Sequence, residues 1–252
     1  MSLMKCLALR FAACLLHNHE SKVVFYHDLH EECANTTGGT SIDTLRRHVR
    51  ITQKLGYRFA STIMDLHSPQ KLLMTFDDGF HGLWSFRDYF IEEGLQPTVF
   101  IAPELVGREG FLSWDEISEL HRLGFHFESH TYSHRPLVDE RNSLSEDDLK
   151  HELIDSKHII EDVIQTAVEQ ICFPRGYFSE RVVDKCRECG YKFLFSSIPG
   201  SVKTRVCCAV MPRNNVERLS DGDYAAVING GMIPYRNRFL RKHYFTERGD
   251  GK

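Results

Sequence analysis

Short runs of apolar, β-branched and aromatic residues alternate along the chain with segments of helical periodicity. Strands are predicted at 23–27, 71–76, 97–102, 125–129, 169–173, 192–196 and 206–212. Helices are predicted between them, at 42–57, 83–94, 113–124, 146–164, 179–188 and 221–228. Short strands separated by helices are typical of an α/β fold with a parallel sheet, and about seven such units favour closure into a barrel.

This alternation defines one domain with a segment on either side. The domain is predicted at residues 23–231, preceded by an N-terminal extension, 1–22, and followed by a basic tail, 232–252. The tail contains six Lys and Arg residues, among them Arg236, Arg238, Arg241 and Lys242. We expect it to be a solvated or frayed end.

The composition is that of an ordinary soluble globular protein, with 42% hydrophobic and 26% charged residues. A net charge of -4, without a basic stripe, argues against a nucleic-acid partner. The apolar run at 6–16 is interrupted by Arg10 and is too short to span a bilayer. It also lacks a clean cleavage site, so neither a membrane span nor a signal peptide is predicted.

Eight cysteines are scattered without regular spacing, which slightly favours a reducing, cytoplasmic compartment, although the compartment stays open. Cys186 and Cys189 form a CxxC that Cys207 and Cys208 could complete as a zinc site. The favoured interpretation is separate thiols, because the CxxC falls at a predicted helix end followed by Gly190.

Polar side chains with chemical potential follow several of the predicted strands. "KLLMTFDDGF" places Asp77 and Asp78 at the end of a buried strand. His27 ends the first strand, and the loop after 125–129 contains His130 and His134 at i, i+4 spacing. Because the carboxyl ends of parallel strands line the active face, these side chains are expected to meet there.

Two imidazoles and one carboxylate leave a divalent cation with net positive charge and open positions for water and substrate. Only one of the two adjacent aspartates needs to bind the metal, and the other can accept a proton from the attacking water. The alternative is a DDG turn with solvated aspartates.

"TFDDGF" and "SHTYSH", in this order and about fifty residues apart, resemble the first two motifs of the polysaccharide deacetylase family, the NodB-homology or carbohydrate esterase family 4 enzymes. Similarity in "QPTVFIAPELVG", "FLSWDEISELHRLGFHFESHTYSH" and "GYKFLFSS" extends the resemblance over roughly residues 23–216. It implies a distorted (β/α) barrel of about seven strands that removes N-acetyl groups from amino-sugar glycans. It also implies Asp77 as the general base and Asp78, His130 and His134 as ligands of a divalent metal: zinc first, with cobalt, nickel or iron as alternatives.

The chain departs from the family in its third motif, Arg-x-Pro-Tyr/Phe-Gly, which here reads "CFPRG". Cys172 stands where the arginine is expected and Arg175 where the aromatic is expected. The backbone N–H of Arg175 could still supply an oxyanion donor, since that role needs no particular side chain. The family's Asp-x-x-Asp-Trp motif and its late Leu-x-His, which normally provides the general acid, are also missing.

"VVFYHDLHEE" resembles the permuted arrangement of exopolysaccharide deacetylases such as those acting on poly-N-acetylglucosamine, in which the acid histidine follows an early strand. His27 fits that place, with His30 as a rival and a purely structural histidine as the alternative.

Three further side chains complete the candidate site. Arg213, at another predicted strand end, is predicted to supply the positive charge near Asp77 that the lost arginine would have given. Tyr132 and Trp114 are candidates for stacking on a sugar ring, with core packing as the alternative.

The predicted function is therefore metal-dependent N-deacetylation of an N-acetylated sugar or glycan. One alternative is a carbohydrate-binding pseudoenzyme, favoured by the degenerate motifs. Another is a hydrolase of the same fold that acts on O-acetyl esters or non-sugar amides. The sequence does not indicate the oligomeric state.

Overall fold

The computed structural model describes residues 3–16, 18–31, 38–139, 143–204 and 206–246. Its centre is a curled sheet in which every pairing is parallel. The strand order is β10 (Asn214–Asn215), β1 (Lys22–Tyr26), β5 (Lys71–Asp78), β6 (Thr98–Ile101), β7 (His126–Ser129), β8 (Gln170–Cys172) and β9 (Phe193–Phe195), and β4 (Arg58–Phe59) adds to β5. A separate pair, β2 (Leu29–His30) and β3 (Thr40–Ser41), lies beside it.

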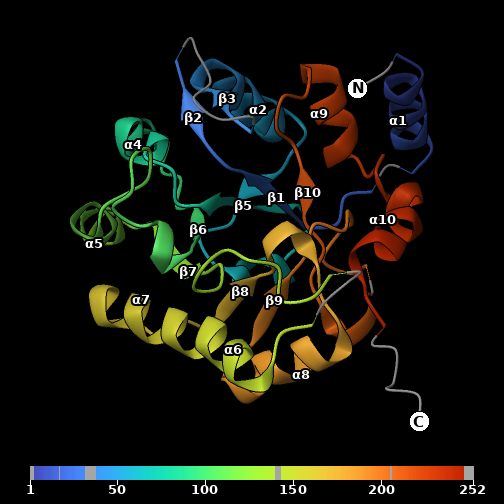
Figure 1. Cartoon of the computed structure of the whole chain (residues 1–252). Helices are drawn as coiled ribbons and strands as arrows, with labels where there is room; N and C mark the ends of the chain where they lie inside the picture. The colour runs from blue at the N-terminus through green and yellow to red at the C-terminus, as the bar shows by residue number, and fades with distance from the viewer. Residues whose placement is uncertain (1–2, 17, 32–37, 140–142, 205, 247–252) are drawn as a thin grey trace.

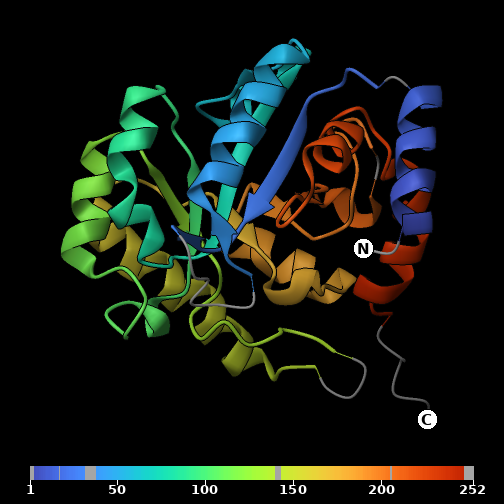
Figure 2. The same cartoon turned by 90° about the horizontal axis from the view of Figure 1, so that it is seen from above.

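Helices surround this sheet (Figures 1 and 2). They are α2 (Ile42–Lys54), α3 (Gly82–Ser85), α4 (Arg87–Glu92), α5 (Trp114–Arg122), α6 (Glu146–Lys150), α7 (Ser156–Ile164), α8 (Glu180–Glu188) and α9 (Asp221–Ile228). A π-helical turn, His151–Asp155, joins α6 to α7. The helix predicted at 83–94 is split into α3 and α4 at Phe86, whose φ of -111° and ψ of 16° are not helical.

The segment 211–215 connects the two edges of the curled sheet. Met211 donates its N–H to Leu194 O at 2.7 Å and bridges β9, and Asn214 pairs with β1. This arrangement is the distorted (β/α) barrel that the sequence predicts. The strand predicted at 206–212 is wrong, because Cys208 and Ala209 have φ of 59° and 55° and cannot extend.

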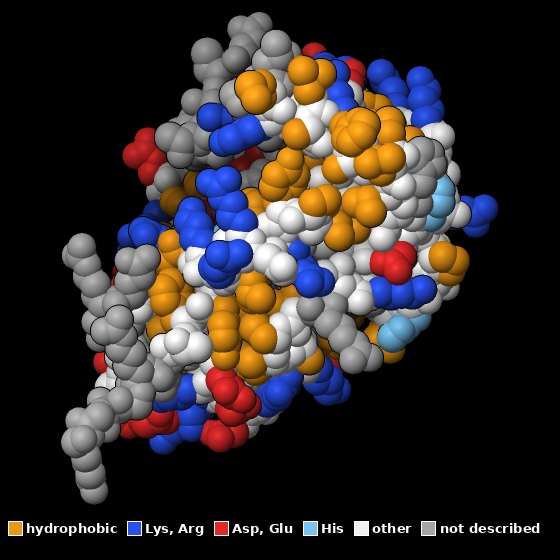
Figure 3. Space-filling view, turned by 90° about the vertical axis from the view of Figure 1, so that its right-hand side faces the viewer, with side chains coloured by type: hydrophobic (Ala, Val, Ile, Leu, Met, Phe, Trp, Pro, Cys, Tyr) orange, Lys and Arg blue, Asp and Glu red, His pale blue; other side chains and the backbone are white. Residues whose placement is uncertain are grey.

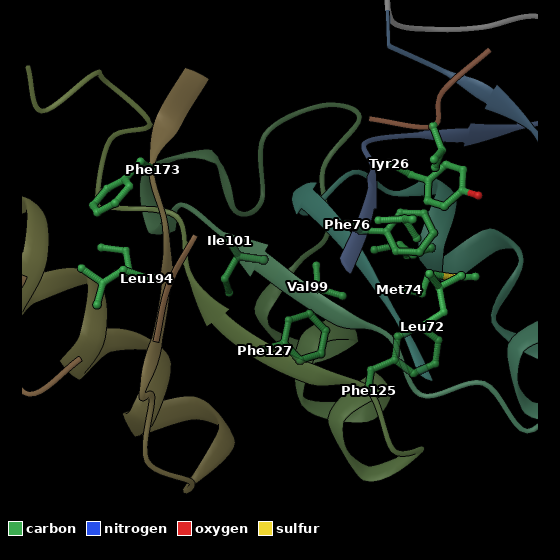
Figure 4. Packing of buried hydrophobic residues seen from close by; sticks show 14 of the residues in the cluster. Tyr26, Leu72, Met74, Phe76, Val99, Ile101, Phe125, Phe127, Phe173 and Leu194 are labelled. Atoms are coloured by element: carbon green, nitrogen blue, oxygen red, sulfur yellow. The ribbon is translucent and has the colours of Figure 1, made fainter. Parts of the chain in front are cut away.

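The strand period of two divides the buried side chains between two hydrophobic clusters. Leu72, Met74 and Phe76 of β5 point one way and pack with residues of neighbouring elements (Figure 4). Leu73 points the other way and packs with Phe100 in the second cluster. Strands buried on both faces explain why their sequences are almost continuously apolar.

A helix near each end of the described chain packs on this domain. In α1 (Leu3–Leu16), Leu9 and Ala13 are buried, and α1 contacts α9. Residues 236–243, which were expected to be a solvated or frayed end, form α10 (Arg236–His243) because Phe239 and Leu240 pack against the core. No helix in the described ranges is both long enough and apolar enough to cross a membrane.

Candidate active site

Asp77 lies at the barrel interior because it shares the face of β5 that carries Leu73 and Thr75. The Arg213 guanidinium reaches it from segment 211–215 with a two-pronged contact, Nη1 to Oδ1 at 2.6 Å and Nη2 to Oδ2 at 2.7 Å. Arg213 also donates to Thr75 Oγ1 at 3.1 Å and lies over the Phe25 ring. Burial disfavours the charge of Asp77, but Arg213 outweighs burial and holds the pKa of that carboxyl well below its usual range.

Asp78, His130 and His134 converge on one point at the ends of β5 and β7. The Nε2 atoms of His130 and His134 lie 3.4 and 3.1 Å from Asp78 Oδ1. His130 donates from Nδ1 to Cys172 O at 2.7 Å, since a carbonyl only accepts, and its Nε2 therefore carries a free lone pair. Burial lowers the pKa of His130 to about 4, so this imidazole is neutral at physiological pH.

This donor set fits a divalent cation. Asp78 Oδ1 is buried and accepts no well-formed hydrogen bond from any described residue, although two ring nitrogens face it. A carboxylate oxygen opposite an imidazole lone pair is repulsive unless a cation lies between them. A second possible ligand group, Asp77 with His130 and Cys172, fits less well. Arg213 already binds both oxygens of Asp77, and burial raises the pKa of the Cys172 thiol well above its usual value.

The backbone around Asp78, His130 and His134 is strained. Asp78, Thr131 and His134 have φ of 71°, 65° and 62°, in the left-handed region that non-glycine residues seldom adopt. Each such residue costs roughly 1–3 kcal/mol, and strain of this kind clusters at functional sites. The surrounding contacts must therefore hold the loop that carries His134 in place.

Glu152 provides those contacts for the loop at 131–135. Its carboxylate accepts hydrogen bonds from Tyr132 N at 3.0 Å, Ser133 N at 2.9 Å, Ser133 Oγ at 2.6 Å and Arg135 Nε at 2.8 Å. Glu152 is 1% exposed and lies in the π-helical turn between α6 and α7. Its role is not predictable from the sequence, because a glutamate within a helical pattern normally indicates a solvated surface.

His27 lies on the other side of Asp78, at the end of β1. Its Nδ1 is 2.8 Å from Glu217 Oε1, and its Nε2 is 4.0 Å from Asp78 Oδ2. Burial disfavours the imidazolium, but the Glu217, Asp77 and Asp78 carboxylates outweigh it and raise the pKa of His27 to about 9. Glu217 was missed by the sequence analysis, although its place just after β10 follows the same strand-end rule. The rival, His30, lies in β2.

Among the described residues, no hydrogen bond, ion pair or ring contact joins the side chains of the other predicted site residues to the two aspartates or to His27, His130 and His134. Arg175 has an exposed side chain, and its φ of 59° and ψ of 4° orient its peptide unusually. The Tyr132 ring lies 4.5 Å from the His151 ring, centroid to centroid. Trp114 is half-buried against the core.

A family model described as polysaccharide deacetylase matches residues 66–194, just over half of the chain. The chain belongs to the polysaccharide deacetylase family. It is 26% identical over 137 residues to YxkH of Bacillus subtilis (strain 168), a region that is 53% of this chain and 47% of YxkH. The chain thus spans about half the length of that curated relative.

Solved deacetylase structures show the same fold. The Streptococcus pyogenes deacetylase PplD in complex with acetate is 18% identical with a TM-score of 0.72, and the match covers 83% of this chain and 98% of PplD. IcaB from Ammonifex degensii is also 18% identical with a TM-score of 0.72, over 85% of this chain and 99% of IcaB. These matches confirm the NodB-homology barrel that the sequence motifs implied.

Proposed function

We propose that this polysaccharide deacetylase homologue is a metal-dependent hydrolase that removes N-acetyl groups from an amino-sugar glycan. The observation that carries the proposal is the convergence of Asp78, His130 and His134 around one buried carboxylate oxygen, Asp78 Oδ1, which accepts no well-formed hydrogen bond from the described residues. A second carboxylate, Asp77, lies beside them with its own counter-charge, and His27 lies opposite. Family membership supports deacetylation as the reaction.

Asp78, His130 and His134 would hold the metal, zinc or another first-row divalent ion. When bound there, it supplies Lewis acidity toward the acetyl carbonyl and toward water. The neutral state of His130 and the ionised state of Asp78 are the protonation states that ligands require.

Asp77 acts as the general base and takes the proton of the attacking water. Arg213 keeps Asp77 ionised and fixes its plane, and each carboxylate oxygen has a second lone pair that remains available for that proton. Arg213 thus supplies the charge that the third motif lacks, and it acts as a positioning residue.

His27 acts as the general acid and donates the Nε2 proton to the departing amine nitrogen, which is otherwise a very poor leaving group. Glu217 accepts the Nδ1 proton of His27, which directs Nε2 toward the centre of the site. The backbone N–H of Arg175 is assigned to the developing oxyanion. Tyr132 and Trp114 are assigned to the sugar, and the products are acetate and a free amino sugar.

Two variants test the roles of the paired aspartates. Asp77→Asn is expected to retain the metal, measured by elemental analysis of purified protein, and to lose acetate release from N-acetylglucosamine oligomers. Asp78→Ala is expected to lose both the metal and acetate release. A fully active Asp77→Asn enzyme would contradict the general-base assignment.

The same assays distinguish the alternative functions. A carbohydrate-binding pseudoenzyme would bind glycans without releasing acetate, even with metal supplied. A hydrolase of O-acetyl esters would tolerate His27→Ala, because an alkoxide leaves far more readily than an unprotonated amide nitrogen and depends less on an acid. The proposed N-deacetylase would lose amide turnover in that variant.

A further inference from the structure

Helix α1 presents an apolar stripe that no part of the described chain covers. The stripe consists of Met4, Leu7, Phe11 and Leu15, which are 81, 58, 67 and 70% exposed. Their spacing places them on one side of the helix, opposite the buried Leu9 and Ala13. The helix therefore has one apolar side for α9 and a second apolar side facing outward, which marks an interaction surface rather than a chance exposed side chain.

Exposed cations lie on α1 and on the neighbouring helix α10. This basic cluster consists of Lys5 on α1 and Arg238, Arg241 and Lys242 on α10. None of the four has an ion-pair partner among the described residues, and neither 3–16 nor 232–245 contains an acidic residue. Positive charge is thus concentrated here in a chain whose net charge is -4.

Three residues of the basic cluster line a pocket between α1 and α10. This pocket has a volume of about 320 Å³, and Lys5, Leu9, Met232, Tyr235, Arg238, Phe239 and Lys242 line it. Figures 1 and 2 both place α1 and α10 side by side. On the same side of the molecule, hydrophobic side chains gather in the upper part of the face and Lys and Arg side chains cross its middle (Figure 3).

We propose that this face docks on an anionic lipid bilayer. In this arrangement α1 lies along the interface with the apolar stripe among the acyl chains, and the basic cluster contacts headgroup phosphates. Charge complementarity selects this occupant, because unpaired cations around exposed apolar carbon match a surface that is anionic outside and apolar beneath. A helix of 14 residues is only about 21 Å long, so it lies on the bilayer rather than spanning it.

A second copy of the chain fits this face less well. A two-fold interface uses the same surface on both partners, so it would bring two basic clusters together. The resulting like-charge repulsion would oppose the burial of the two apolar stripes. The docking surface is independent of the deacetylase chemistry, and its test needs no substrate.

The test is co-sedimentation with large vesicles of phosphatidylcholine alone, or of phosphatidylcholine with about one third phosphatidylglycerol. We expect the wild-type chain to sediment only with the anionic vesicles and to be released at high salt. Arg238→Ala/Lys242→Ala should bind about 25-fold more weakly, since each cation near an anionic surface contributes about fivefold. Leu7→Ser/Phe11→Ser should bind at least about tenfold more weakly, because it removes inserted apolar area.

Matched changes elsewhere on the surface serve as controls. Met64→Ser/Ile91→Ser removes two exposed apolar side chains, and Lys54→Ala/Arg58→Ala removes two exposed cations. Neither pair should alter sedimentation, and all variants should melt as the wild type does because the changed side chains are exposed. Undiminished vesicle binding by Leu7→Ser/Phe11→Ser would overturn the proposal. So would salt-insensitive binding to neutral vesicles, or a dimer in light scattering that Leu7→Ser/Phe11→Ser dissociates.

Discussion

Glu152 is expected to control metal affinity without being a ligand. Its carboxylate accepts four hydrogen bonds from the loop at 131–135, and the two flanking residues, Thr131 and His134, have positive φ. Without these bonds the loop can relax toward ordinary backbone conformations. Relaxation would move His134 away from Asp78 Oδ1, which lies 3.1 Å from its Nε2.

The magnitude follows from comparing the strain with the contacts that oppose it. Two positive-φ residues store roughly 2–6 kcal/mol. The two backbone N–H groups bonded to the charged Glu152 contribute about 1.5–3 kcal/mol each. The bond from Arg135 adds little, because that side chain is 42% exposed. The backbone strain and the hydrogen bonds that oppose it are similar in size, so the loop in Glu152→Ala is no longer held in its strained conformation. Restoring that conformation for metal binding should cost about 3 kcal/mol, which is equivalent to about hundredfold weaker metal binding.

The assay is zinc affinity measured by competition with a fluorescent chelator. Glu152→Gln keeps the shape and one acceptor oxygen, so its affinity should fall between those of wild type and Glu152→Ala. The matched control is Glu161→Ala, which removes a carboxylate that accepts Val168 N at 2.8 Å on α7. This control should lower the melting temperature without weakening zinc binding. Wild-type zinc affinity in Glu152→Ala, or equal weakening in the control, would refute the reasoning.

Three other changes have expected outcomes. Glu217→Gln removes the charge from the acceptor that orients His27, so amide turnover should fall at least tenfold while turnover of an activated acetyl ester changes little. Equal losses on the two substrates would contradict the general-acid assignment of His27. Arg213→Ala leaves Asp77 buried without its counter-charge, so the free energy of unfolding measured in urea should fall by about 3–5 kcal/mol and acetate release should be lost. Unchanged stability or an unchanged rate would refute the pairing. Burial lowers the pKa of His48 to about 4, so the unfolded chain binds this proton first and stability falls as pH drops from about 6.5 toward 4. His48→Gln should remove up to about 3 kcal/mol of this pH dependence of the free energy of unfolding. Denaturant unfolding between pH 7.5 and 4.5 measures it, and a difference in unfolding free energy between variant and wild type that stays constant over this range would count against the prediction.

The strand-end rule predicted which polar side chains meet, because parallel strands bring their carboxyl ends to one edge whatever the details of closure. Asp77, Asp78, His130 and His27 all follow from it, and their chemical roles stay predictions. Glu152 could not be predicted, since its burial depends on a π-helical turn that helical periodicity does not indicate.

Two errors in the predicted elements arose where tertiary contacts override local preference. The apolar run at 206–212 is typical of a strand, yet Cys208 and Ala209 turn the backbone into the left-handed region. The cationic C-terminal segment was expected to fray, but α10 is stabilised by packing of Phe239 and Leu240 rather than by its own propensity.

Arg213 lies in segment 211–215, which joins the two barrel edges, whereas Asp78, His130 and His134, the proposed metal ligands, lie at the ends of β5 and β7 in the middle of the sheet. Loosening of segment 211–215 would separate the Arg213 guanidinium from Asp77 while leaving the proposed metal ligands in place. On gentle heating, the protein should therefore lose activity before it loses its metal. A form that retains the metal but is inactive should be populated below the melting temperature.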